Sequence, residues 1–343
     1  MSKVTPTSHR KSDHIRINLE EDVETSVVTG LAQIRFVHEA VPELDYNDIK
    51  SSTSFLGKQL DSPLLISSMT GGTSDAGRIN QRLAAAAQSQ RIALGVGSMR
   101  AVIEDPNLAS SFDIRKTAPD ILLFANLGAV QLNYGYDIDE CRRAVEMIGA
   151  DALILHFNPL QEALQPEGDT NFAGLLKRIE SLSKKMEVPL IAKEVGWGIS
   201  GESAQKLINA GIQVIDVAGA GGTSWSQVEM HRATTPEDAT TASVFRDWGI
   251  PTATAIQEVR NTLPEVPLIA SGGIRNGVEI AKCIALGADI VGMAGPFLKA
   301  ATEDADHVER IIVRVTKEIR VAMFATGSRD LKALRKAKFR ALS

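Results

Sequence analysis

Eight short apolar runs recur in this sequence from residue 63 onward, each followed by a glycine-rich or polar turn and then a stretch with helical periodicity. The runs are PLLISSM, RIALGVG, ILLFANL, DALILHF, PLIAKEV, QVIDVAG, PLIASGG and DIVGMAG. Near-continuous apolar strands alternating with amphipathic helices are typical of a parallel sheet covered by helices. Eight such units favour a closed (β/α)₈ barrel over an open doubly wound sheet. The predicted fold class is therefore α/β, with the barrel at residues 63–303.

Two segments lie outside the predicted barrel. Residues 1–62 are expected to cover its bottom and to supply an arm that reaches the substrate, and residues 304–343 to form C-terminal helices that pack on it. The basic end of the chain, ATGSRDLKALRKAKFRAL, is interpreted as a solvated helical face. Long loops at 156–171 and 219–248 follow the fourth and sixth runs. In a barrel, such loops lie at the carboxyl ends of the strands, where active sites form.

Composition excludes several classes of function. The 343 residues are 44% hydrophobic and 23% charged, and 37 basic against 42 acidic residues give a net charge of −5. Nothing global therefore points to nucleic acid or to an acidic membrane surface as a partner. Cys141 and Cys283 form neither a disulfide framework nor a CxxC motif. With no signal-peptide core and no membrane-length apolar run, the chain is expected to be cytoplasmic.

Two glycine-rich turns follow the seventh and eighth runs, SGGIRNG (271–277) and GMAGPFL (292–298). Glycine lets the backbone approach an anion closely, and each turn opens a helix whose N-terminal N–H groups would face that anion. Barrels often bind phosphate with the loops after these two strands. The predicted phosphate site consists of Gly272, Gly273, Arg275, Ala294 and Gly295.

Polar residues stand at the ends of other runs. Met69-Thr70-Gly71 could lie along a flat ring, and Ser98, Arg100 and Asn126 would face the same barrel mouth. Thr223, in DVAGAGGTSW, carries a hydroxyl that could reach a phosphate.

Lys193 follows an apolar strand, so its ammonium should emerge in the barrel mouth. A buried unpaired lysine is costly. Lys193 is therefore interpreted as the partner of a bound anion or of a reduced flavin; the alternative is an ion pair with Glu194 or Asp216.

The stretch HFNPLQEAL (156–164) crowds polar groups at the end of the fourth run. His156, Gln161 and Glu162 are its candidate functional residues. One histidine and one good carboxylate make a poor metal site by themselves. Three interpretations stay open on residue types alone: an ordinary polar loop, a metal site, or the place where a substrate reacts.

Several motifs occur together in order: HRKSDHI, MTGGT, GSMR, NLGAVQL, HFNPLQE, KEVGWGIS, DVAGAGGTSW, SGGIRNG and GMAGPFL. On these motifs the chain resembles the type 2 isopentenyl diphosphate isomerases, barrels of the FMN-binding type, nearly from end to end. SGGIR and MAGPFL are shared by many FMN barrels, whereas HFNPLQE and DVAGAGGTSW are more specific. The resemblance implies FMN as cofactor, Mg²⁺ as metal, and interconversion of isopentenyl and dimethylallyl diphosphate.

The resemblance also implies roles for individual residues. The FMN phosphate is assigned to Thr223, Gly273, Arg275, Ala294 and Gly295. The flavin ring is assigned to Met69, Thr70, Gly71, Ser98, Asn126 and Lys193. The substrate diphosphate is assigned to Arg10, Lys11, Arg100, His156 and, through Mg²⁺, Glu162, with Gln161 beside the reacting carbons. Gln161, His156 and Lys193 are the expected catalytic residues.

The chemistry agrees with this assignment in outline. Moving an isolated double bond requires adding a proton to one carbon and removing one from another, and no ordinary side-chain base suits so weak an acid. A reduced flavin could serve as acid and base. The reaction is redox-neutral, so NAD(P)H would be needed only to reduce the flavin. Mg²⁺ is usually held by one or two carboxylates plus substrate phosphates, which a single Glu162 fits. A homo-oligomer, with a tetramer suggested by the resemblance, is also expected.

Two other functions compete. A conventional FMN oxidoreductase acting on a small anionic substrate would need a base for hydride transfer, commonly histidine or cysteine. No histidine lies near the seventh run, and Cys141 and Cys283 fall on predicted helices. A phosphate-binding barrel related to inosinate dehydrogenase would need a cysteine in a catalytic loop. The isomerase is therefore the favoured hypothesis.

Overall fold

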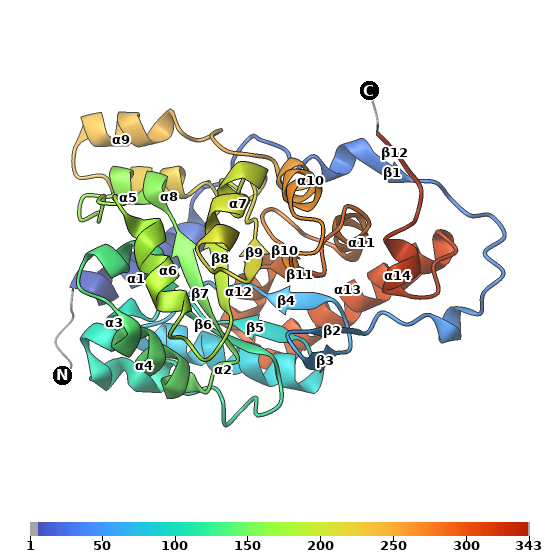
Figure 1. Ribbon diagram of the computed structural model, residues 1–343, viewed down its shortest axis with the longest axis horizontal. Coiled ribbons are helices and arrows are strands. Elements are labelled where there is room, and N and C mark those ends of the chain that lie inside the picture. The colour runs from blue at the N-terminus through green and yellow to red at the C-terminus, as the bar shows by residue number, and fades with distance from the viewer. Residues whose placement is uncertain (1–5, 342–343) are drawn as a thin grey trace.

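The eight predicted strands form a closed barrel in the computed structural model, which describes residues 6–341 (Figure 1). Neighbouring strands are parallel, and the ring closes where Val291 lies opposite Leu64. The predicted α/β barrel is confirmed. Residues 1–5 and 342–343 of the two expected terminal segments lie outside the described residues. The strands are β4 (Leu64–Ile66), β5 (Ala93–Gly95), β6 (Leu123–Gly128), β7 (Ala152–Phe157), β8 (Leu190–Glu194), β9 (Val214–Asp216), β10 (Leu268–Ala270) and β11 (Ile290–Met293).

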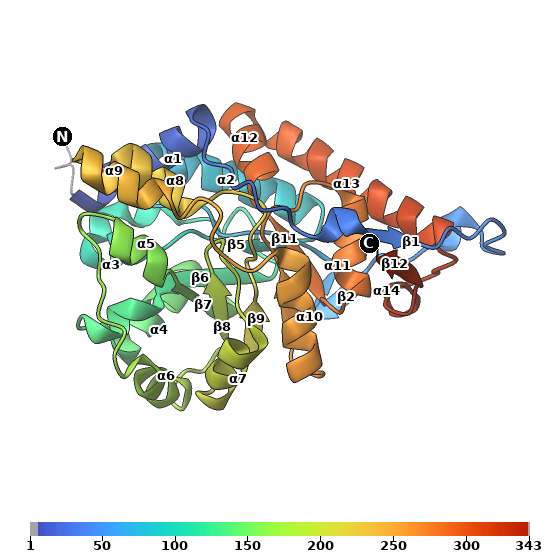
Figure 2. The ribbon, with the colours of Figure 1, turned by 90° about the horizontal axis from the view of Figure 1, so that it is seen from above.

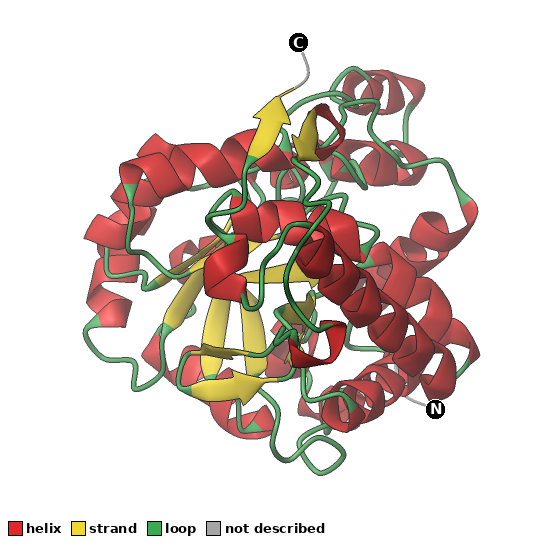
Figure 3. Cartoon of the chain, turned by 90° about the vertical axis from the view of Figure 1, so that its right-hand side faces the viewer, coloured by secondary structure: helices red, strands yellow, loops and turns green. Residues whose placement is uncertain are grey.

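One helix or more follows each barrel strand, and the strands lie inside the helices (Figures 2 and 3). Local sequence explains where these helices begin and end. In α4 (Ile138–Ile148), Asp137 and Glu140 form a capping box, and Gly149 ends the helix with φ of 57°. The series comprises α2 (Ser74–Ser89), α3 (Arg100–Glu104), α4 (Ile138–Ile148), α6 (Leu175–Ser183), α7 (Gly201–Asn209), α10 (Thr252–Thr262), α11 (Gly277–Ala285) and α12 (Gly295–Glu303). Short 3₁₀ turns occupy Leu31–Gln33, Tyr46–Asp48, Pro106–Ser111 and Ala129–Asn133.

A hairpin closes the amino-terminal end of the barrel. It consists of β2 (Thr53–Phe55) and β3 (Lys58–Leu60), which pair antiparallel. Phe55 and Leu60 are buried against the lower inward-facing side chains of the barrel strands. That lower layer consists of Leu65, Ala93, Leu122, Phe124, Ala152, Ile154, Ile191, Val214, Ile269 and Ile290.

Both long loops contain helices, which the sequence analysis did not predict. The first holds α5 (Pro159–Leu164), and the second holds α8 (Trp225–Arg232) and α9 (Pro236–Ser243). Proline at the first helical position starts α5 and α9, and the Thr235 side chain caps α9. The helical periodicity was missed because α5 is short and α8 is polar on most sides. Helix α1 (Pro6–Glu20) lies beside α8.

The C-terminal segment differs from the predicted helices at its end. Helix α13 (Ala305–Ala325) packs on α11 and α2, and α14 (Leu331–Leu334) follows. Strand β12 (Phe339–Ala341) then pairs antiparallel with β1 (Ile34–Phe36). The basic tail is therefore not one helical face. Its last residues pair through their backbone with Ile34–Phe36, more than 300 positions away, and local periodicity cannot reveal such a partner. No helix of the described residues has the length and apolarity required to cross a bilayer.

Candidate active site

The upper inner layer of the barrel is polar because side chains alternate between the two faces of each strand. Residues two positions beyond the apolar lower layer face the same way. These residues, which we call the inner ring, are Ser67, Gly95, Asn126, His156, Lys193, Asp216, Ser271 and Gly292. Lys193 is thus the one lysine or arginine of the ring. The ring lies at the carboxyl ends of the strands, where barrel active sites form.

Lys193 is buried at the end of β8, level with His156 and Asp216 on the neighbouring strands. Its Nζ donates a hydrogen bond to the Glu194 carbonyl oxygen at 2.7 Å. The Glu194 carboxylate in turn accepts the Gly196 N–H at 2.7 Å, which holds the turn in place. Within residues 6–341, neither Glu194 nor Asp216 forms an ion pair with Lys193. Its charge therefore remains available to a bound anion.

His156 is held by its neighbour in the ring. Its Nδ1 lies 2.8 Å from Asn126 Oδ1, so Nδ1 carries the proton when the amide oxygen accepts. Burial, together with the charges of Lys11 and Lys193, lowers the pKa of His156 to about 3. The imidazole is consequently neutral at pH 7. Because nearby cations contribute to the low pKa, an anion bound among them would raise it.

Glu162 is fixed in orientation by three donors from its own segment. Oε1 accepts from Asn158 Nδ2 at 2.8 Å, while Oε2 accepts from Gln165 Nε2 at 2.5 Å and from the Asp169 backbone N–H at 2.7 Å. The side chain is buried, with 6% of its surface exposed. Among the residues that the structure describes, no ion-pair partner is found for this fixed carboxylate, which suits it as a ligand for a cation.

Gln161 is oriented by residues that the sequence analysis missed. Its Oε1 accepts from Asn158 Nδ2 at 3.1 Å, and its Nε2 donates to Glu229 Oε1 at 2.8 Å. Glu229 is buried on α8, where it also contacts His14 and Arg232. Although burial raises it, those contacts hold the pKa of Glu229 below its usual value. An ionised Glu229 thus fixes the orientation of the Gln161 amide, with Nε2 toward Glu229 and Oε1 toward Asn158.

Helix α1 brings cations to the same region. Burial and the charges of Arg10 and Arg100 lower the pKa of Lys11 to about 7. The Arg100 guanidinium is also paired with Glu104 at 2.7 Å and Asp169 at 2.5 Å. An anion bound here would compete with these carboxylates for Arg100 and would be attracted by Lys11.

The two predicted glycine turns differ in what requires glycine at each position. Gly272 and Gly273 have φ of 105° and 68°, which disfavours a side chain at either position. A Cβ added at Gly273 would lie 2.2 Å from the Gly221 carbonyl oxygen, whereas one at Gly295 would meet nothing within 4 Å. Gly295 begins α12 and lines the cavity, so the first N–H groups of this helix are candidates to bind a phosphate. Arg275, which belongs to the 271–277 turn, pairs with Glu24 at 2.8 Å.

All but one of the predicted site residues line a single cavity of about 590 Å³ at the barrel mouth. The exception is Gly71, which faces the Phe112 ring: an added Cβ would lie 2.1 Å from it. The lining residues that the sequence predicted are Arg10, Lys11, Met69, Thr70, Ser98, Arg100, Asn126, His156, Gln161, Glu162, Lys193, Thr223, Gly272, Gly273, Arg275, Ala294 and Gly295.

Relatives match this chain along almost its whole length. An isopentenyl-diphosphate delta-isomerase of Nostoc sp. is 57% identical over 96% of this chain and 94% of its own. Enzymes of the same name from Synechococcus sp. and Rickettsia bellii are 53% and 49% identical, covering 95% and 96% of this chain and 94% and 97% of their own. The chain belongs to the isopentenyl-diphosphate delta-isomerase family.

Two further comparisons agree with the barrel fold of this family member, and the first of them concerns FMN. A family model described as FMN-dependent dehydrogenase matches residues 160–341, the part that contains Thr223 and both glycine turns. Solved structures of mandelate oxidase variants share the fold. One has a TM-score of 0.69 and 17% identity, covering 99% of this chain and 100% of that one.

The cavity of this isopentenyl-diphosphate delta-isomerase family member fits FMN. The hydroxyls of Ser67, Ser68 and Thr70 are buried without a hydrogen-bond partner among the described residues. All three residues line the cavity, where a polar ring edge would satisfy them. The glycine turns follow β10 and β11, on the side of β4 that borders β11, and they suit a phosphate. One cavity thus has polar groups that suit the flavin ring and glycine turns that suit the phosphate of the same FMN molecule.

The metal expected for this family fits less completely. Among the described residues no group of three or more histidine, cysteine, aspartate or glutamate side chains could hold an ion. Glu162 is the one metal ligand that the sequence predicted, and it lines the cavity. One fixed carboxylate suits Mg²⁺ delivered with substrate phosphates, since Mg²⁺ takes few protein ligands. It does not suit a metal resident in the absence of substrate.

Proposed function

We propose that this protein is an isomerase that interconverts isopentenyl diphosphate and dimethylallyl diphosphate, using reduced FMN and Mg²⁺. The observation that carries the proposal is one cavity lined by two glycine turns on one side and by Arg10, Lys11 and Arg100 on the other. The relatives of 49–57% identity that bear this name support it. The mandelate oxidase likeness concerns the fold alone, and both cysteines are buried on helices. A conventional oxidoreductase therefore has less support.

The two sides of the cavity follow from strand order. The glycine turns follow β10 and β11. In the ring of eight strands β6 lies opposite β10, and β7 lies opposite β11. That far side carries Asn126, His156 and α5, and Lys11 of α1 contributes to the charge around His156. A cofactor phosphate and a substrate diphosphate would thus be held apart, with the inner ring between them.

In this mechanism FMN, when bound and reduced, supplies the acid–base group that an unactivated alkene requires. The chain supplies position and charge. Lys11, Arg10 and Arg100 bind the diphosphate, and Glu162 binds its Mg²⁺. Gln161, oriented by Glu229, presents its amide beside the reacting carbons. Lys193 provides positive charge at the flavin.

An anaerobic assay tests the function. The protein with reduced FMN, Mg²⁺ and isopentenyl diphosphate is expected to form dimethylallyl diphosphate without any net change in flavin absorbance. Oxidised FMN or removal of Mg²⁺ should abolish product formation. Full activity under oxidised, metal-free conditions would contradict the mechanism, and stoichiometric flavin reduction by a substrate would favour the oxidoreductase.

Substrate capture should depend on pH through Lys11. Its pKa of about 7 means that the free enzyme loses this cation as pH rises through 7. We therefore expect kcat/KM to fall above pH 7, approaching tenfold per pH unit. Lys11→Arg should remove this descending limb, because arginine stays charged. An unchanged limb in Lys11→Arg would assign the titration to another group.

Three further features belong to the same proposal. NAD(P)H would serve as reductant of the flavin, since the isomerisation itself consumes no electrons. The protein would act in the cytoplasm as a homo-oligomer. Reduction of the bound flavin by NADPH and the mass in solution are the measurements that check them.

A further inference from the structure

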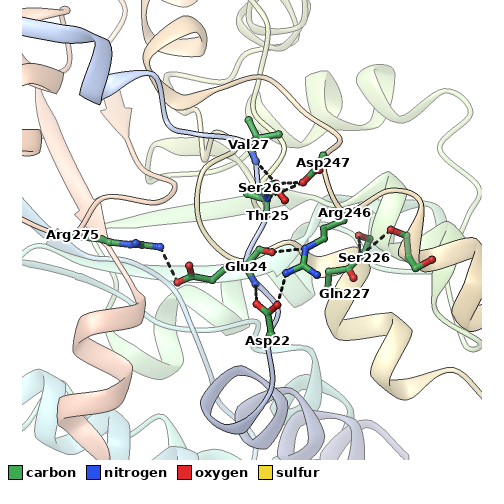
Figure 4. Close-up of polar contacts among 11 residues, drawn as sticks. Asp22, Glu24, Thr25, Ser26, Val27, Ser226, Gln227, Arg246, Asp247 and Arg275 are labelled. Atoms are coloured by element: carbon green, nitrogen blue, oxygen red, sulfur yellow. Dashed lines mark hydrogen bonds and ion pairs between the residues drawn. The ribbon is translucent and has the colours of Figure 1, made fainter.

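Residues 21–29 form a strap between α1 and the phosphate side of the cavity (Figure 4). Two backbone hydrogen bonds join it to the segment that carries Thr223. Thr25 N–H donates to the Gly222 carbonyl at 3.0 Å, and Ser224 N–H donates to the Val23 carbonyl at 2.8 Å. In this antiparallel pairing Glu24 lies opposite Thr223, whose own N–H points away from the strap. The strap therefore backs one wall of the predicted phosphate site.

Two residues outside the cavity anchor the strap. Arg246 donates to the Glu24 carbonyl oxygen at 2.9 Å and pairs with Asp22 at 2.5 Å (Figure 4). Asp247 accepts from Ser26 N–H at 2.8 Å. Further along, the strap packs against the glycine turns: a Cβ at Gly273 would lie 2.7 Å from Thr29 Cγ2. The backbone of Glu24 is thus fixed on both sides of the residue.

The side chain of Glu24 reaches across to Arg275, and the two groups lie 2.8 Å apart (Figure 4). Both are more than half exposed, at 65% and 55% of their side-chain surface. An exposed pair of flexible side chains contributes little by itself. Here the anchored strap holds the carboxylate beside the guanidinium, which raises its effective concentration there.

We propose that Glu24 is a specificity residue of the cofactor site, an internal anion on Arg275 that the cofactor phosphate must displace. The proposal rests on the proposed flavin site and deepens it. The Arg275 guanidinium cannot donate all of its N–H groups to a phosphate while one of them is bound to Glu24. A phosphate beside Arg275 would also be repelled by the carboxylate. Glu24 therefore weakens the preference for a phosphorylated flavin over an unphosphorylated one.

Titration of the apoprotein with FMN and with riboflavin, followed by flavin fluorescence, tests this. Glu24→Gln is expected to tighten FMN binding roughly threefold to tenfold, the range for one partly screened like charge. Riboflavin, which has no phosphate, should bind unchanged. The gain should shrink as salt rises. Glu187→Gln, which breaks a surface ion pair with Arg142 on α4, is the matched control and should alter neither flavin.

A double-variant cycle separates this role from a general loosening of the strap. In an Arg275→Met background FMN should bind more weakly, and adding Glu24→Gln should tighten FMN binding less than it does in the unaltered protein, because only the direct repulsion between carboxylate and phosphate is left to remove. Equal effects of Glu24→Gln on FMN and riboflavin, or weaker FMN binding, would overturn the inference but leave the flavin site standing. Failure of both flavins to bind the unaltered protein would overturn the flavin site and the inference together.

Discussion

Replacing Glu162 by glutamine is expected to raise the KM for isopentenyl diphosphate about 100-fold, equivalent to roughly 2.7 kcal/mol. Glutamine keeps the size and one acceptor oxygen but loses the charge that would hold Mg²⁺ beside the diphosphate. The concentration of Mg²⁺ giving half-maximal rate should rise in parallel. Steady-state kinetics over a Mg²⁺ series measures both.

The same variant has a structural alternative to exclude. Glu162 accepts hydrogen bonds from Asn158, Gln165 and Asp169, so its loss could simply loosen the loop. A loosened loop would lower the melting temperature and affect kcat without changing the Mg²⁺ dependence. Glu265→Gln, an exposed position before β10, serves as control. An unchanged Mg²⁺ requirement in Glu162→Gln would remove Glu162 from the metal site.

Replacing Lys193 by alanine is expected to lower kcat about 1000-fold, the upper range for loss of one preorganised electrostatic group. Lys193 is the one lysine or arginine of the inner ring, and its ammonium is held at the Glu194 carbonyl. Losing that cation should also disfavour a negatively charged reduced flavin, so the reduction potential of bound FMN should become more negative.

Lys193→Arg separates charge from position. If charge matters most, arginine should restore the reduction potential, while kcat recovers only in part because the guanidinium is larger. Lys206→Ala on α7, an exposed lysine paired with Glu202, is the matched control. A loss of less than tenfold in Lys193→Ala with an unchanged potential would show that Lys193 is structural.

Much of the barrel and of its polar layer could be predicted because strands impose a two-residue period. Once PLIAKEV is taken as a strand with Ile191 inside, Lys193 must face the mouth. The same reasoning places His156 above Ile154. Both residues lie where this period predicts. The local sequence pattern is sufficient to predict where a side chain points when backbone geometry alone determines its direction.

The parts that were missed depend on contacts between distant segments. Glu229 orients Gln161 from 68 positions away, and nothing in WSQVEMHR marks its glutamate as buried. Its neighbour His14 stood inside the quoted HRKSDHI motif, which was a usable signal. Strand β12 was missed for a similar reason, since its partner β1 lies near the opposite end of the chain.

The hairpin β2–β3 closes the amino-terminal end of the barrel. Because Phe55 and Leu60 are buried there, a ligand in the cavity has no route out through that end. Substrate and product would therefore share the opening at the barrel mouth, where α1 contributes Arg10 and Lys11 to the lining of the cavity. In the proposed mechanism α1 would therefore move aside once for substrate entry and once for product release. The cations proposed to bind the diphosphate would also slow its departure.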